Sequence, residues 1–352
     1  MNEINYSLLE QVHRLRPSRL SRIIGVGSYL PADEITSIEI MQEINTDQKY
    51  GLPCDWMDKK MGISARRMSK SEDLPSDLAI KAAEEALENS PEVHPRDIDA
   101  VIFCGIERDK PEPATAHIIQ NKLGLNAAFT FDVANACFGF FQGLSLADSL
   151  IDTGTIDYAL IVTGEVTTQM SRAVIEQLKE GVSPSEARNL WGMLSVGDAG
   201  GAMIIGPSNS NKRGFSKFHQ LSESRHHTLC HYKWKENGRV DAHMNMSQIV
   251  ARGLKLNLQV YDEIMENLGW QNVDWVIAHQ TGKVAFEQVQ RLHQVDKCKV
   301  IKTYPDLGNI TTATLPVCFK KLMRSGSLLQ GDTVAGLFAG SGLVAGQFGY
   351  IA

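Results

Sequence analysis

The sequence predicts an α/β protein built from two related halves, and three observations support this. Short apolar strands alternate with amphipathic helices along most of the chain, which is the pattern of layered α/β domains. The segment 98–104 (IDAVIFC) lines up with the segment 273–279 (VDWVIAH), which has the same order of apolar and acidic positions. The helix starts at Cys137 and Asn309 line up at nearly the same spacing, so two pairings in chain order indicate a duplicated unit.

Composition places the chain among ordinary globular proteins. The 352 residues carry a formal net charge of -6, with 43% hydrophobic and 22% charged residues, which argues against a nucleic-acid-binding surface. The six cysteines form no CxxC pair and the N-terminus lacks the apolar run of a signal peptide, so we expect free thiols and a cytoplasmic location. The apolar run 333–352 is interrupted by five glycines and predicts buried strands, not a membrane span.

The elements can be predicted in order. Residues 1–20 are amphipathic and predict an N-terminal helical extension. Strands and helices of the first half are expected at 22–31, 37–44, 77–89, 98–104, 129–133, 138–151 and 158–165. Those of the second half are expected at 249–268, 273–279, 309–326 and 333–340. We therefore divide the chain into the extension 1–20, a first half 21–206 and a second half 207–352.

Cys137 is the first candidate for chemistry. Residues 129–133 alternate like a buried strand, and compact residues then turn the chain into the helix that begins near Cys137. Unpaired N–H groups and the helix dipole lower the pKa of a thiol at a helix start, which favours the nucleophilic thiolate. A small apolar residue in a packed turn is the equally open alternative from this stretch alone.

His279 and Asn309 are the natural partners of such a nucleophile. His279 ends a strand that matches the one ending at Cys104, and Asn309 lies at the helix start matched to Cys137. Strand ends and helix starts of open α/β sheets gather at one crevice, where ligands bind. A core histidine and a turn-forming asparagine are the commoner interpretations of each residue taken singly, but together the three indicate nucleophilic catalysis.

The chain resembles the thiolase-like condensing enzymes, specifically their ketoacyl-ACP synthase III branch, from about residue 23 to the C-terminus. The shared motifs are GVGSYLP (25–31), DWM (55–57), MGI (61–63), RR (66–67), FDVANAC (131–137), GDAGGA (197–202), HQ (279–280), GNITTA (308–313) and GSGL (340–343). The resemblance implies a five-layered αβαβα fold of two duplicated halves and a homodimer. It also implies acyltransferase activity on fatty acyl thioesters of CoA or acyl carrier protein, with no permanently bound cofactor.

The resemblance assigns roles to individual residues. Cys137 is the acylated nucleophile, and His279 and Asn309 surround the incoming donor thioester. The backbone N–H groups of Cys137 and Gly342 form the oxyanion hole, where losing one donor typically costs about 10²–10³ in rate. Trp56 and Lys60 occupy positions that hold the nucleotide end of CoA in relatives. The surrounding LPCDWM departs from the family wording, so a buried tryptophan and a solvated lysine remain alternatives.

Glu112 distinguishes the kind of condensation. It lies in the loop 109–116, which precedes Cys137 in the chain, and the loop resembles the subgroup that joins two acyl thioesters head to head in bacterial olefin synthesis. In that subgroup a glutamate reaches the neighbouring subunit's site as general base, so we expect a non-decarboxylative Claisen condensation that gives a β-ketoacyl product. A solvated charge in a proline-rich loop is the alternative for Glu112.

Other functions stay open at this point. The chain could be a decarboxylative synthase that uses malonyl-ACP or a pyrone- or resorcinol-forming ketosynthase. An inactive partner subunit is a further hypothesis, although such subunits usually lose the cysteine or histidine that this chain retains.

Two further groups of residues have simpler interpretations. The segment 226–231 (HHTLCH) contains metal-ligand types, but it lacks a second ligand group, so we expect a polar surface segment and no metal site. Phe138, Phe140, Phe141 and the segment 166–194 are candidates for lining an acyl tunnel, with core packing as the default.

Overall fold

The computed structural model describes residues 19–352 except 211, 269–271, 293 and 295. The predicted N-terminal extension, 1–20, therefore lies almost entirely outside the described residues. Within the described part of the chain, no helix combines the length and the apolar character that crossing a membrane requires.

Two β-sheets form the frame of the molecule. The first has the strand order β1 (Ser21–Tyr29), β7 (Ala199–Pro207), β6 (Ala159–Glu165), β4 (Ala100–Phe103) and β5 (Phe129–Asp132). The second has the order β11 (Trp275–Ala278), β12 (Thr333–Gly340), β13 (Val344–Ile351) and β8 (Gly214–Ser222). In both, a parallel core of strands is extended by antiparallel strands: β4 is parallel to β5 and β6, and β11 is parallel to β12.

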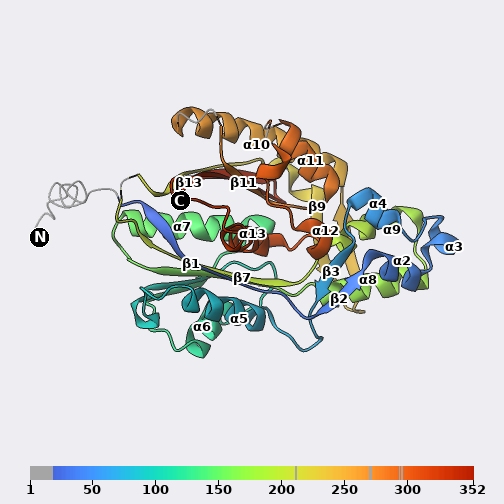
Figure 1. Cartoon of the computed structure of the whole chain (residues 1–352). Helices are drawn as coiled ribbons and strands as arrows, with labels where there is room; N and C mark the ends of the chain where they lie inside the picture. The colour runs from blue at the N-terminus through green and yellow to red at the C-terminus, as the bar shows by residue number, and fades with distance from the viewer. Residues whose placement is uncertain (1–18, 211, 269–271, 293, 295) are drawn as a thin grey trace, which may run out of the picture.

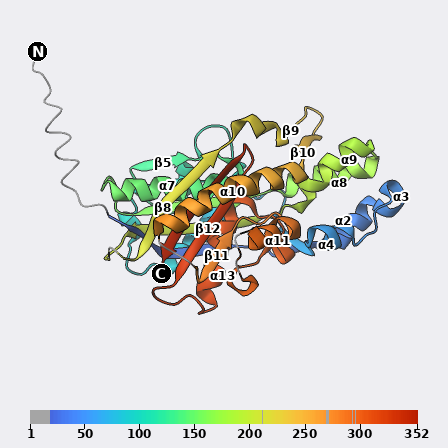
Figure 2. The ribbon, with the colours of Figure 1, turned by 90° about the horizontal axis from the view of Figure 1, so that it is seen from above.

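Helices cover both sheets in layers. The outer face of the first sheet carries α5 (Pro75–Glu88) and α6 (Thr115–Lys122), while α7 (Gly139–Asp152) and α13 (Thr314–Arg324) lie between the sheets (Figure 1). The outer face of the second sheet carries α10 (Met246–Leu268) and α11 (Lys283–Leu292), as Figure 2 shows from above. The expected five-layered αβαβα thiolase-like fold is confirmed.

Glycines let α5 approach the first sheet closely. A Cβ at Gly164 would lie 1.8 Å from the Pro75 carbonyl oxygen, and one at Gly200 would lie 2.2 Å from that of Leu78. Four of the buried residues of α5 are alanines, namely Ala79, Ala82, Ala83 and Ala86. Residues without bulky side chains on both surfaces therefore set the spacing of the two layers.

The two halves repeat each other at a constant offset in the numbering. Ala100 begins β4 and Trp275 begins β11, while Gly139 begins α7 and Thr314 begins α13. Ala136 and Thr311 are related by the same offset, and both have the left-handed backbone, with φ of 46° and 47°. This corrects the sequence pairing of Cys137 with Asn309: Thr312 is the position equivalent to Cys137, and Asn309 lies just before it.

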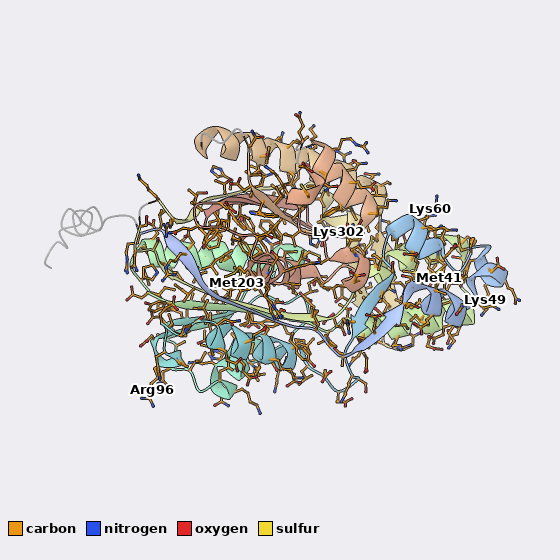
Figure 3. The ribbon with its side chains drawn as sticks, viewed as in Figure 1. Met41, Lys49, Lys60, Arg96, Met203 and Lys302 are labelled. Carbon is orange, nitrogen blue, oxygen red and sulfur yellow. The ribbon has the colours of Figure 1, made fainter. Side chains whose placement is uncertain are left out.

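A small helical cap extends from one end of the layers. It contains α2 (Ser37–Ile44), α3 (Thr46–Tyr50), α4 (Trp56–Met61), α8 (Thr168–Glu180), α9 (Pro184–Trp191) and α12 (Tyr304–Leu307), with the strands β2 (Asp33–Thr36), β3 (Ala65–Met68), β9 (Cys230–Trp234) and β10 (Val240–Met244) nearby. Most of these helices share a separate apolar core around Met41, which Figure 3 places inside the cap, whereas Met203 belongs to the core of the sheets.

The strand before Cys137 differs from expectation. The alternation of 129–133 predicts a buried strand, but β5 is the edge of the first sheet and Phe129 is 38% exposed. The expectation was wrong because alternation shows which residues share a face of a strand and does not show whether another layer covers that face.

Candidate active site

Cys137 lies in a tight turn between β5 and α7. The 3₁₀ turn Ala136–Phe138 contains it and follows directly from the left-handed Ala136. Gly139 then starts α7 so close to β4 that an added Cβ would lie 2.6 Å from the Cys104 carbonyl oxygen. The turn thereby holds the thiol at the carboxyl end of the parallel strands, where ligands bind in this class of fold.

Asn309 is held by the backbone of a neighbouring loop. Its N–H donates to the Ser195 carbonyl over 2.8 Å, and its own carbonyl accepts from Gly197 over 3.2 Å. The side-chain oxygen accepts from the Thr311 N–H over 3.0 Å. Because this bond occupies the oxygen, the side-chain NH₂ group is the end of the amide that is left for a ligand.

His279 follows β11 and is buried in a neutral form. Its backbone N–H donates to the Leu337 carbonyl over 2.9 Å, which continues the pairing of β11 with β12. Its Nδ1 atom is buried without a partner among the described residues. Burial lowers the pKa of His279 to about 4, so the imidazole is uncharged at neutral pH and can accept a proton.

The structure brings Cys137, His279 and Asn309 to one cavity, which we call the central cavity. Cys230 adds a second thiol, and the remaining lining is mostly aliphatic. The other lining residues are Cys230, Met244, Met246, Ile249, Val250, Gly253, Leu254, Asn257, Thr281, Ala285, Val289, Leu337, Ala339, Gly340, Ser341 and Leu343.

Burial favours the protonated form of the Cys137 thiol. Burial raises its pKa well above the usual range, and the nearby Cys230 and Glu165 raise it further. This corrects the expectation that the helix start lowers that pKa. Desolvation of the thiolate outweighs the dipole of α7, so forming the thiolate requires transfer of the proton to a base, and the neutral His279 lines the same cavity.

Gly342 lies in the hairpin between β12 and β13, between Ser341 and Leu343, which line the central cavity. Its φ of 143° falls in a region that glycine adopts far more readily than other residues. At Gly340, two positions earlier, an added Cβ would lie 3.0 Å from Phe138 Cβ and 3.1 Å from Phe138 N. The hairpin therefore packs directly on the turn that contains Cys137, which is the placement that a second oxyanion-hole donor requires.

Glu165, at the end of β6, was missed by the sequence analysis. It is fully buried, and its Oε1 accepts hydrogen bonds from the Thr312 hydroxyl and from the Ile106 N–H. Its Oε2 has no partner among the described residues. Burial raises the pKa of Glu165 to about 7. The signal was a glutamate at the end of an otherwise apolar strand, a position where a charge is unusual unless it has a partner or a function.

Glu112 does not reach the central cavity of its own chain. It is exposed in the loop between β4 and α6. The end of this loop is fixed by Asp132, the last residue of β5, whose carboxylate accepts 2.9 Å hydrogen bonds from the backbone N–H groups of Thr115 and Ala116. The loop therefore lies beside the exposed edge of the first sheet.

Lys60 lies near the entrance and Trp56 does not. Lys60 is exposed on α4, which contacts α11 (Figure 3), and it lines an outer hollow together with Ser195 and Lys283. This outer hollow shares Met246, Val250, Thr281 and Ala285 with the central cavity. Trp56 instead packs on Trp191 with ring centroids 6.2 Å apart, in the core of the cap.

The side chains of the segment 226–231 point to different neighbours. His226 lies 3.4 Å from the Glu223 carboxylate, His231 stacks on His243, and Cys230 points to the central cavity. Among the described residues, no three His, Cys, Asp or Glu side chains are grouped so that they could hold a metal ion.

The residues proposed to line an acyl tunnel pack elsewhere. Phe138, Phe140 and Phe141 are buried in the core between the sheets, as the default interpretation predicts. The segment 166–194 forms α8 and α9 of the cap and supplies no lining residue of the central cavity. The sequence could not show that α10, which is distant in the chain, supplies lining residues of the central cavity.

Comparisons with known proteins agree with this geometry. Residues 131–224 match the family model of 3-oxoacyl-[acyl-carrier-protein (ACP)] synthase III, and residues 264–348 match that of its C-terminal part. An acyl-CoA:acyl-CoA alkyltransferase of Xanthomonas campestris is 30% identical over 91% of this chain and 95% of its own length. A β-ketoacyl-[acyl-carrier-protein] synthase III of Methylococcus capsulatus is 27% identical over 90% of this chain and 94% of its own length.

Solved structures show the same likeness. A glutamate-to-alanine variant of Xanthomonas campestris OleA superimposes with a TM-score of 0.89 at 27% identity, covering 96% of this chain and all of that one. A cysteine-to-serine variant of the same protein, with bound lauric acid and lauroyl-CoA, superimposes with a TM-score of 0.88 at 27% identity, covering 95% of this chain and 99% of that one.

Proposed function

The chain belongs to the 3-oxoacyl-[acyl-carrier-protein] synthase III family of thiolase-like condensing acyltransferases, and from this premise we propose that it joins two fatty acyl thioesters without decarboxylation. The observation that carries the proposal is the central cavity, where Cys137, His279 and Asn309 meet a mostly aliphatic lining. An aliphatic lining around a few polar groups suits an alkyl chain whose thioester must be oriented. The likeness to the acyl-CoA:acyl-CoA alkyltransferase supports the choice of two acyl-CoA substrates.

The first step is acylation of Cys137. His279 takes the thiol proton as the sulfur attacks the thioester carbonyl, and the Asn309 amide donates to the incoming thioester. The N–H groups of Cys137 and Gly342 stabilise the oxyanion of the tetrahedral intermediate. The bond to the CoA sulfur then breaks, and the proton held by His279 leaves with CoA, so the site returns to its neutral state.

The second step forms the carbon–carbon bond. Glu112 of the partner subunit removes an α-proton from the second acyl thioester, and the resulting carbanion attacks the acyl group on Cys137. The bond to the Cys137 sulfur breaks, and the product is a β-ketoacyl thioester. The sulfur leaves as a thiolate that takes up a proton, and Glu112 gives its proton to solvent, so the site returns to its starting state. A carboxylate is a suitable base here if the bound substrates exclude water from it, because desolvation raises its basicity.

This second step requires a homodimer. The edge strand β5 leaves unpaired backbone groups and the partly exposed Phe129, and a strand edge of this kind invites pairing with another chain. Two copies related by a two-fold axis would pair their β5 strands antiparallel and exchange the neighbouring Glu112 loops. Each loop would then lie near the central cavity of the other subunit.

The test supplies the purified protein with myristoyl-CoA and no malonyl donor. We expect CoA release, an acyl adduct on Cys137 and a β-keto product, while Glu112→Ala keeps the adduct and lowers product formation by about 10² or more. The neighbouring Glu107→Ala serves as a control for loss of a carboxylate near the same loop. Product that forms only when malonyl-ACP is present, with Glu112→Ala harmless, would overturn the proposal.

A mixing experiment tests the transfer of Glu112 between subunits. Neither Cys137→Ser nor Glu112→Ala should condense acyl-CoA alone. A mixed dimer of the two contains one site with an intact cysteine and an intact glutamate from the partner subunit, so activity should return on mixing. No recovery in demonstrably mixed dimers would place Glu112 outside the chemistry.

A decarboxylative synthase is the second candidate. It is favoured by the curated relatives named β-ketoacyl-[acyl-carrier-protein] synthase III, which match almost the whole chain at 26–28% identity. In that reaction malonyl-ACP supplies the carbanion by losing carbon dioxide, and no base is needed to remove an α-proton.

A further inference from the structure

Gly253 is an unusual residue for its position in α10. It lies inside a 23-residue helix, where glycine costs about 1 kcal/mol relative to alanine. It is buried, yet an added Cβ would meet no atom within 4 Å outside the local helix backbone. Other buried glycines are small because a neighbour leaves no room: at Gly164 and Gly200 the added Cβ would lie 1.8 Å and 2.2 Å from backbone oxygens. Packing against protein atoms therefore does not explain why position 253 is a glycine.

The space beside Gly253 belongs to the central cavity. Gly253 lines this cavity together with Val250, Leu254 and Asn257, which lie about one helical turn or less from it and form the inner face of α10. Val289 of α11 and Leu337 of β12 also line the cavity. Figure 2 shows α10 lying across the second sheet, so this space runs between the helix and the outer face of the sheet.

The wall formed by α10 is anchored just beyond Gly253. The buried Gln347 of β13 donates from its side-chain amide to the Asn257 carbonyl over 2.7 Å and to the Asn257 side-chain oxygen over 3.0 Å. Asn257 is 4% exposed and lies one turn further along α10, away from the residues shared with the outer hollow. The helix is thus pinned to the sheet at this point and cannot simply move outward to make room for a larger side chain.

We propose that Gly253 determines the chain length of the substrate, because the space that its missing side chain leaves holds the distal methylenes of a long, unbranched acyl chain. The inference rests on the proposed function, in which fatty acyl thioesters occupy the central cavity. Apart from Asn257, whose side-chain oxygen accepts from Gln347, the lining near Gly253 is aliphatic and contains no aromatic ring, which suits a flexible saturated chain. A side chain at position 253 occupies the volume that a long chain needs and leaves the thioester end of a short chain untouched.

The experiment compares chain lengths in variants of the full-length protein. CoA release is measured with hexanoyl-, decanoyl- and myristoyl-CoA for the wild type, Gly253→Ala, Gly253→Leu and the control Lys255→Leu, with malonyl-ACP added only if the wild type needs it. Lys255 is exposed on the same helix, so the control adds the same side chain outside the cavity. Leucine and alanine favour the helix more than glycine does, so the variants are expected to fold.

We expect Gly253→Leu to lower kcat/KM for myristoyl-CoA at least tenfold relative to hexanoyl-CoA, with Gly253→Ala intermediate and Lys255→Leu like the wild type. Unchanged chain-length preference in Gly253→Leu, or an equal loss at all three lengths, would overturn the inference. CoA release by the wild type only with malonyl-ACP contradicts the proposed non-decarboxylative reaction, but the comparison of chain lengths still decides the role of Gly253. If no acyl-CoA releases CoA, with or without malonyl-ACP, the result refutes both the proposed function and the role of Gly253.

Discussion

Burial disfavours the charged forms of two ionisable side chains near Cys137. His279 has a pKa lowered to about 4 and Glu165 a pKa raised to about 7, and burial is the main cause in both. In the proposed mechanism the neutral imidazole of His279 takes the proton of Cys137, and its lowered pKa makes it a weak base for that step. The raised pKa leaves Glu165 only partly charged near pH 7, which lessens its repulsion of a thiolate at Cys137. At the residue scale, low polarity therefore sets which protonation states the site can use.

His279 makes the folded protein sensitive to acid. Its folded-state pKa lies below the ordinary value of 6.5, so its contribution to stability is present above pH 6.5 and is lost as the pH falls toward 4. The shift corresponds to about 3 kcal/mol. We expect His279→Gln to lose less stability than the wild type between pH 6.5 and 4 in chemical denaturation. Parallel stability curves for the two proteins would contradict this.

Glu165 makes the stability of the folded protein depend on pH in the opposite direction. Its folded-state pKa is raised from 4.5 to about 7, so the stability that comes from its protonated form is present below pH 4.5 and is lost as the pH rises through 7. The difference is again about 3 kcal/mol. Glu165→Gln keeps an oxygen that can accept from Thr312, and we expect it to remove the loss of stability between pH 4.5 and 7. The measurement is the free energy of unfolding across this range, and an unchanged pH dependence would contradict the prediction.

At the scale of elements, the duplicated turns explain why the site lies at the junction of the halves. The turn that contains Cys137 packs on Gly340 at the end of β12, and the matched turn that contains Thr312 bonds to Glu165 at the end of β6. Gly340 and Glu165 end matching strands and are themselves related by the offset between the halves. Each half therefore supports the helix start of the other, although only the first half carries the thiol.

The close contact between α5 and the first sheet gives a prediction about stability. Gly164→Ala would place a Cβ 1.8 Å from the Pro75 carbonyl oxygen, and we expect overpacking to lower the free energy of unfolding by about 1–3 kcal/mol. Gly253→Ala is the matched control, because it adds the same methyl group to open space within a helix and should stabilise the protein by about 1 kcal/mol. Urea denaturation measures both, and a Gly164→Ala protein as stable as the wild type would contradict the predicted clash.

At the scale of the whole molecule, a complete site as proposed needs two chains. The central cavity holds Cys137, His279 and Asn309 of one chain, while Glu112 lies on an exposed loop beside β5. The exposed Phe129 on that edge strand marks the surface where a second chain would add. Dimer formation would then be linked to catalysis, because an isolated chain would lack its base.

Phe129→Asp tests this link. A charge at the paired edge strand should disfavour the dimer, because two like charges would be buried across the two-fold axis. We expect a smaller species in light scattering, an acyl adduct on Cys137 and loss of the condensation product. Leu329→Asp is the control, since Leu329 is 63% exposed in the second half of the chain. A Phe129→Asp protein of unchanged mass and activity would exclude β5 as the dimer edge.

The sequence by itself determined the local features of this protein. Apolar periodicity predicted most strands and helices. The repeated sequence pattern at 98–104 and 273–279 predicted two related halves. Both patterns depend on neighbours in the chain. The helix predicted at 77–89 begins slightly earlier, at Pro75, because the Asp77 carboxylate accepts from the Leu74 N–H. The motifs around Cys137, His279 and Asn309 likewise identified residues that meet at one cavity.

Only the tertiary structure decided the properties that depend on what surrounds a residue. Burial reversed the expected pKa shift of Cys137, and the strand order turned 129–133 from a buried strand into an edge. Glu165 became part of the site through Thr312, which is distant in the chain. The open space beside Gly253 exists because α11 and the second sheet stand opposite α10. Desolvation, exposure and empty volume are set by distant segments, and a sequence pattern records only near neighbours.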